Sequence, residues 1–229
     1  MNNLNIIGTS HIAKQSIEEI KKAVEEFQPQ IIAVELDAQR ATALMQEQKG
    51  KASFRDIRKI GIKGYAFVKI GHYIQQKLGK SVGVSPGSEM KTALEIAHIK
   101  NLQVALIDQP INITLKNFSK ELTWKEKWRF FSDLVKGLLF PKRQMKNYGL
   151  EEFDLRKVPE EKVILKIINQ MKKQYPSIYK TIISDRDKYM VKQLVKIMRE
   201  HPEKKILAVV GAGHQEGMNK LLLKVDIVR

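Results

Sequence analysis

The sequence predicts an α/β fold: a mostly parallel central sheet with helices on both faces and a helical insertion. Short apolar runs recur along the chain, segments of helical periodicity lie between them, and polar residues follow the runs directly. Strands that alternate with helices are typical of an open parallel sheet. The chain has 229 residues, of which 43% are apolar, enough for one hydrophobic core. We therefore expect a single domain over 1–229, with helical insertions at about 51–85 and 119–180.

The first three elements form a strand–helix–strand unit. The first strand is expected at 4–9, LNIIGT. A capping box from Ser16 to Glu19 then opens a helix whose apolar residues recur at helical spacing until Pro29 ends it. The run at 30–36, QIIAVEL, is typical of a strand buried on both faces of a parallel sheet.

The same alternation continues towards the C-terminus. Ser88 is placed to cap a helix, and a third strand follows at 103–108. A helix from about 184 to 200 leads into a fourth strand at 205–210, and a last helix runs to Leu223.

Two segments interrupt this pattern and form the predicted insertion. Residues 51–85 are expected to form an amphipathic helix followed by a Gly/Ser-rich loop, and 119–147 form an amphipathic helix with both tryptophans and a basic end. Aromatic residues beside cations suit an anionic membrane surface. A helix packed on its neighbour at 54–78 gives the same pattern, so both interpretations stay open.

Composition limits the class of protein. The chain has no cysteine, which excludes disulfide scaffolds, cysteine zinc sites and thiol nucleophiles. Its net charge of +16 attracts anions, but no nucleic-acid motif is present, so nucleic acid is the least favoured partner. There is no signal-peptide pattern and no apolar run of the ~20 residues that a span needs. We expect a place in the cytoplasm or at the cytoplasmic membrane face, allow a homo-oligomer, and read the apolar ending KVDIVR as a sign of a longer natural chain.

Polar residues at the ends of the predicted strands form the candidate site. His11, Glu35, Asp108 and His214 each follow an apolar run, and in open parallel sheets ligands bind beyond the carboxyl ends of the strands. Both histidines close a Gly-x-x-His motif. Two histidines and a carboxylate can hold a divalent metal with an open position, or a water for general base catalysis. Taken alone, either motif has a structural interpretation, as a capping residue or an ion-pair partner.

A second concentration of charge lies at 184–190, SDRDKYM. One interpretation is simple helix capping by Ser184 and Asp185. The other is that Arg186 points into the site and stabilises an oxyanion or clamps a carboxylate. The nearby GAGHQEG motif lacks the spacing of a dinucleotide-binding loop.

These segments, in this order, resemble the TraB/PrgY family, which is grouped with Tiki, erythromycin-esterase-like and ChaN-like proteins. The resemblance rests on matches over most of the chain: IIGTSHIAKQSIEEIKKAVEEFQPQIIAVELDAQR at 6–40, GVSPGSEMKTALEIA at 83–97, VALIDQPINITLKNF at 104–118, SDRDKYMVKQL at 184–194 and VVGAGHQEGM at 209–218.

The resemblance implies a metal-assisted, peptidase-like hydrolase acting on a peptide or related acyl bond, with PrgY-like members shutting down peptide pheromone activity. A divalent metal would be held by His11, Glu35 and His214, and Glu35 is alternatively the general base. Positions that match family motifs extend the site, with Arg186 and Glu89 expected to be catalytic and Arg40, Asp108 and Asp187 expected to bind substrate. The alternative is a peptide-binding module that uses the same cleft without catalysis. One departure is that Gln109 and Pro110 follow Asp108, where the family usually has Asp-Arg-Asp.

Overall fold

A computed structural model of the chain describes residues 3–9, 14–46, 87–139 and 161–225. The predicted helical insertion at 51–85 lies outside these ranges. Residues 140–160 of the second predicted insertion also lie outside them. Along the chain the elements are β1 Leu4–Thr9, α1 Lys14–Phe27, β2 Ile31–Val34, α2 Ala38–Met45, α4 Ser88–Ile99, β3 Gln103–Leu106, α5 Ile111–Glu121, α6 Trp124–Leu139, α8 Glu161–Gln174, α9 Pro176–Tyr179, η1 Lys180–Ser184, α10 Asp185–Glu200, β4 Ile206–Gly211 and α11 Ala212–Leu222.

The four strands form one parallel sheet in the order β1-β4-β2-β3, which confirms the predicted fold class. β1 and β2 are consecutive in sequence but are separated by β4. The register places Thr9 opposite Gly211, so the strands that carry the two Gly-x-x-His motifs are neighbours.

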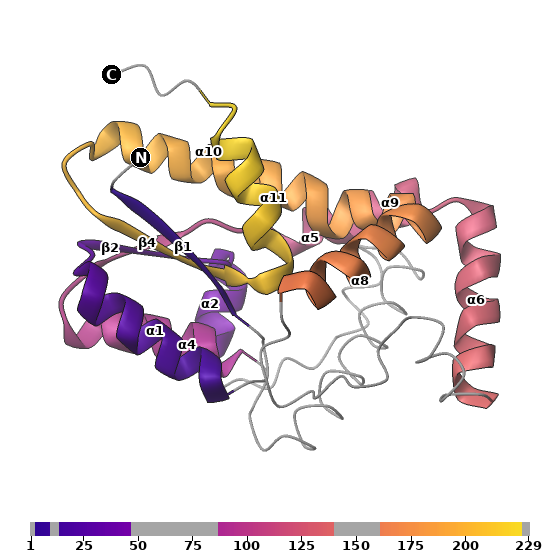
Figure 1. Cartoon of the computed structure of the whole chain (residues 1–229), viewed down its shortest axis with the longest axis horizontal. Helices are drawn as coiled ribbons and strands as arrows, with labels where there is room; N and C mark the ends of the chain where they lie inside the picture. The colour runs from indigo at the N-terminus through magenta and orange to yellow at the C-terminus, as the bar shows by residue number, and fades with distance from the viewer. Residues whose placement is uncertain (1–2, 10–13, 47–86, 140–160, 226–229) are drawn as a thin grey trace.

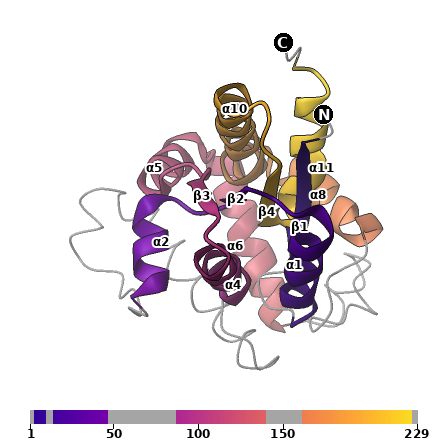
Figure 2. The ribbon, with the colours of Figure 1, turned by 90° about the vertical axis from the view of Figure 1, so that its left-hand side faces the viewer.

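Helices cover both faces of the sheet (Figures 1 and 2). Alternate strand residues point to opposite faces, as Ala33 packs towards α10 and α11 while Ile32 packs towards α1 and α4. β2 and β4 are buried along their whole length because each has a strand on either side and a helix layer on each face. This double burial explains their unbroken apolar sequences.

The predicted helix starts need correction. α1 begins at Lys14, so Ser16 lies inside the helix and is not its N-cap. The N-cap of α4 is Gly87, in the left-handed region at φ 84°, and Ser88 is the first helical residue. At the other end of α1 the prediction is confirmed, because the helix stops at Phe27, just before Pro29.

Helices α6, α8 and α9 lie beyond the carboxyl ends of the strands, on the right of Figure 1. α6, α8 and α9 belong to the helical insertion predicted at 119–180. No helix in the described ranges is long and apolar enough to span a bilayer.

Candidate functional site

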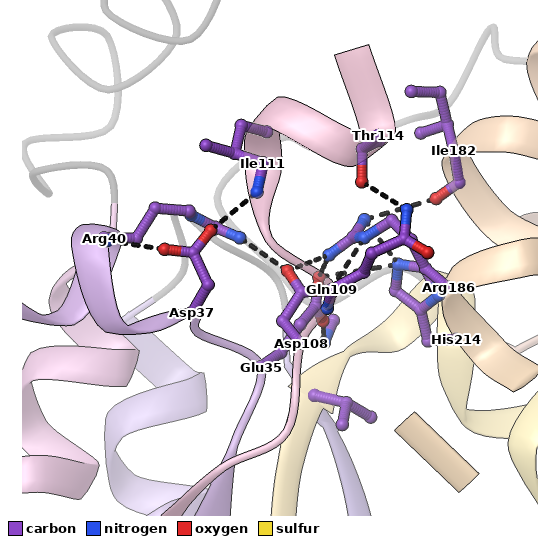
Figure 3. Close-up of polar contacts among 12 residues, drawn as sticks. Glu35, Asp37, Arg40, Asp108, Gln109, Ile111, Thr114, Ile182, Arg186 and His214 are labelled. Carbon is purple, nitrogen blue, oxygen red and sulfur yellow. Dashed lines mark hydrogen bonds and ion pairs between the residues drawn. The ribbon is translucent and has the colours of Figure 1, made fainter. Parts of the chain in front are cut away.

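A buried cluster of charged residues lies at the carboxyl edge of the sheet (Figure 3). Glu35 directly follows β2 and Asp108 follows β3 by two residues. His214 lies in the first turn of α11, just after β4, and Arg186 lies in the first turn of α10. Parallel strands end on the same edge of a sheet. This topology therefore brings Glu35 and His214 together although they are 179 residues apart in sequence.

Arg186 stands at the centre of the cluster, and each of its five N–H groups has an acceptor. Nε and Nη2 donate to the two carboxylate oxygens of Asp108, at 3.0 and 2.7 Å. Nη2 also donates to Glu35 Oε1. Nη1 donates to the carbonyl oxygen of Ile182 at 3.2 Å and lies 3.0 Å from His214 Nε2. The guanidinium therefore links three strand ends, and none of its donors is left over for a ligand in this arrangement.

Burial by itself would lower the pKa of Arg186, but the charges and hydrogen bonds of Glu35 and Asp108 outweigh it and raise the pKa above its ordinary value. Arg186 thus remains a permanent cation. Its removal would leave two buried carboxylates without their main counter-charge.

The path of the backbone into α10 delivers Arg186 to this position. η1 is a π-helical turn in which the amide of Asp185 donates to the carbonyl of Lys180, five residues earlier. The helix therefore runs on without a break, and Ser184 has helical dihedral angles and makes no side-chain cap. The capping interpretation of Ser184 is wrong, and Arg186 points towards the strand ends. π-turns inside helices are frequent at functional sites.

His214 is oriented by a carboxylate on its other ring nitrogen. Its Nδ1 lies 2.6 Å from Asp187 Oδ1. Because Arg186 can only donate, Nε2 of His214 must be the acceptor in that contact, which leaves the proton on Nδ1, donated to Asp187. Burial raises the pKa of Asp187, although the hydrogen bond from His214 and the charge of Arg186 act in the opposite direction.

Glycine at position 217 makes room for Asp187. A Cβ atom at Gly217 would lie 2.2 Å from Asp187 Oδ2, inside any van der Waals contact. The last glycine of GAGHQEG is thus explained by packing against Asp187. Sequence reasoning missed this role, and the only available signal was a glycine inside a helix, which normally costs stability.

Glu35 is held at both oxygens. Oε1 accepts from Arg186 and lies 3.5 Å from His214 Nε2, and Oε2 accepts from the amide of Gly211 at 2.5 Å. The carboxylate therefore faces the imidazole across a short gap beside the guanidinium.

Arg40 lies at the rim of the cluster. Its Nη1 donates to Asp108 Oδ2 at 2.7 Å, and its side chain is 37% exposed. The nearby Asp37 caps α2 through the amide of Arg40 and also accepts from the amide of Ile111, at the start of α5. These bonds join two helix starts to the site. Asp37 was visible in the sequence as a polar residue after a strand, but its bridging role depends on tertiary contacts.

Gln109 occupies the position where the resemblance leads one to expect arginine. It is buried, its backbone N–H donates to Asp108 Oδ1 at 2.7 Å, and its side-chain Nε2 donates to the hydroxyl of Thr114 at 2.9 Å. Two arginines from elsewhere in the sequence, Arg40 and Arg186, contact Asp108 here. Glu89, a further buried carboxylate, lies in the first turn of α4.

The predicted metal ligands are only partly described. His11 lies outside the described residues, and Glu35 and His214 both contact Arg186. A divalent cation between them would have to displace the guanidinium or lie against its charge, so in this arrangement the two residues do not fit a metal. Within the described ranges no group of three or more His, Asp or Glu side chains is arranged to hold one.

An uncharacterized protein of Methanocaldococcus jannaschii is 35% identical, and the alignment covers 96% of this chain and 53% of that protein. The TraB domain-containing protein of Homo sapiens is 24% identical, with 94% and 61% covered. A solved structure of an erythromycin esterase mutant in its open conformation has a TM-score of 0.32 and 17% identity, and the alignment covers 91% of this chain and 60% of that one.

The chain thus spans between about half and three fifths of the length of these curated relatives. The TraB/PrgY/gumN family matches residues 2–225, and the chain belongs to this family.

Proposed function

We propose that this domain hydrolyses an acyl bond, in a peptide or an ester, and that His214 transfers the protons while Glu35 holds Arg186 beside it. The observation that carries the proposal is the buried cluster at the strand ends, in which one guanidinium holds Glu35, Asp108 and His214 together and Asp187 orients the histidine. A histidine with a carboxylate on Nδ1 and an acceptor lone pair on Nε2 has the arrangement of a general base.

In the proposed reaction, the oxygen of a water molecule attacks the carbonyl carbon while Nε2 of His214 takes one of its protons. Asp187 then stabilises the imidazolium, as a carboxylate does in a catalytic triad. The C–N or C–O bond breaks, and His214 returns the proton to the leaving group. The 3.0 Å contact between Arg186 and Nε2 must lengthen first, which the substrate would achieve by entering beside it.

Arg186 acts in this scheme as a positioning residue, since four of its five donors hold the surrounding acids and the histidine. Arg40 is the better candidate for direct contact with substrate, because part of its guanidinium reaches solvent. It would bind a carboxylate or carbonyl oxygen of the substrate.

Metal assistance by His11, Glu35 and His214 stays a prediction. It requires that Arg186 withdraw from Glu35 and His214. Elemental analysis of protein purified without chelating resin tests it: stoichiometric metal in the wild type that is lost in a His11/His214 double variant supports the metal, and turnover that is unchanged by chelators contradicts it.

The activity test pairs an ester panel with a peptide library, each with and without divalent metals. Glu35→Gln and His214→Asn should abolish turnover per folded molecule, as measured against circular dichroism. His98→Asn, an exposed histidine on α4, is the matched control and should retain full activity. Turnover that survives in both site variants would contradict the proposed roles.

A peptide-binding module is the second candidate, and the saturation of Arg186 favours it. Every donor of this residue is engaged and the cluster is nearly closed to solvent, as expected of a rigid platform. Tight peptide capture by the wild type without product formation would support binding and overturn the hydrolase. Capture should then weaken in Arg40→Met, and the exposed Arg199→Met should leave it unchanged.

A further inference from the structure

Helix α6 is attached to the rest of the molecule along one side. Glu126 accepts from the amide of Ser177 at 2.7 Å, and Tyr175 donates from its hydroxyl to Asp133 at 2.5 Å. The ring of Phe130 packs edge-on against Tyr175, with 6.4 Å between centroids. These contacts fix which face of α6 points inwards.

The opposite face of α6 exposes two tryptophans. Trp124 and Trp128 are 70% and 68% exposed. At about 100° per residue, their positions lie roughly half a turn from those of Glu126 and Asp133. Large exposed aromatics on one face of a helix indicate an interaction surface rather than a packing face.

Cations flank this tryptophan face. Lys125 and Lys136 are exposed, and the ammonium of Lys127 lies 4.6 Å from the centre of the Trp124 ring. The one buried acid of the helix's first turn, Glu126, is turned to the attached side. Aromatic rings with surrounding lysines match the interfacial region of an anionic bilayer, where indole rings lie at headgroup level and lysines meet lipid phosphates.

We propose that the tryptophan face of α6 is a docking surface for anionic membranes. The helix has 16 residues and several charges, so it would lie in the plane of the interface and not cross the bilayer. A second copy of the chain fits this face less well, because it would set a net charge of +16 against another +16. This proposal is independent of the hydrolase.

Intrinsic fluorescence provides a direct test, because the only two tryptophans of the chain are Trp124 and Trp128. Vesicles of phosphatidylcholine with about 30% phosphatidylserine should shift their emission to the blue and sediment the protein, and added salt should reverse both. Vesicles of phosphatidylcholine alone should do neither to the same extent. An unchanged emission maximum, or binding that salt does not affect, would overturn the proposal.

Matched variants separate this surface from the overall charge of the protein. Lys125→Glu with Lys136→Glu should lower partitioning about 25-fold or more, since each of the two surface cations contributes roughly fivefold. Lys192→Glu with Lys196→Glu changes the net charge equally on exposed positions of α10 and should lower it less than about threefold. Equal losses in the two double variants would overturn the proposal.

Replacement of both tryptophans by serine should abolish sedimentation without changing the melting temperature, because both side chains are exposed. Binding that persists in this variant would assign the membrane contact elsewhere. Blue-shifted emission without vesicles that moves to the red on dilution would assign the face to self-association, and would also overturn the proposal.

Discussion

Replacing Arg186 by methionine should cost a large share of the stability of the domain. The side chain is only 12% exposed, and those of its partners Glu35 and Asp108 are 3% and 2% exposed, so water cannot take the place of the guanidinium. Breaking a buried ion pair by removing one partner costs about 3–5 kcal/mol. A domain of this kind has about 5–15 kcal/mol in total. With roughly 2–4 °C per kcal/mol for a chain of this length, the melting temperature should fall by about 6–20 °C.

Urea unfolding followed by circular dichroism measures this loss. Arg199→Met is the matched control, because it makes the same substitution at an exposed position in the last turn of the same helix, and it should change stability by less than about 0.5 kcal/mol. A loss below about 1 kcal/mol, or equal losses in both variants, would refute the conclusion that Arg186 holds the site together.

Three further predictions follow from individual contacts. Gly217→Ala should destabilise the protein by roughly 1–3 kcal/mol, because the new Cβ would displace Asp187. Gly213→Ala in the same helix, where the atoms nearest to a Cβ are 3.9 Å away, should instead stabilise it by up to about 1 kcal/mol. Denaturant midpoints of the two variants that move in the same direction would contradict the packing argument. The pKa of Asp187 is raised above its ordinary 3.8, so the stability it contributes is fully present below that value and is lost as the pH rises through the raised pKa. Unfolding free energies over a pH series should show this decline in wild type relative to Asp187→Asn, and a pH-independent difference would count against it. For Glu126, burial opposes ionisation, but hydrogen bonds from Ser177 and Thr123 prevail and lower its pKa below 4.5. Glu126→Gln should therefore cost about 1–2 kcal/mol of unfolding free energy at neutral pH and nothing in acid. A deficit that persists in acid would mean that packing and not charge is lost.

The strands could be located from sequence because their burial leaves a local record. β2 and β4 are covered on both faces, so the runs at 30–36 and 205–210 are almost wholly apolar, and the strands were found within two residues of their predicted ends. Helix starts were less predictable. Ser88 is the first residue of α4 and not its N-cap, Ser184 makes no side-chain cap bond, and Ser16 lies inside α1, because each start depends on where the preceding backbone runs.

The order of apolar runs and polar residues along the chain is enough to predict that polar residues stand at the carboxyl ends of parallel strands and meet at one edge of the sheet. The burial of the strands on both faces leaves a pattern in neighbouring residues, and parallel strands of one sheet all end at the same edge. The folded structure was needed to find that β4 lies between β1 and β2, that a π-turn carries Arg186 into the cluster, and that Gly217 makes room for Asp187. Those features depend on pairings between residues far apart in the chain, whose energies come from contacts that no local pattern records.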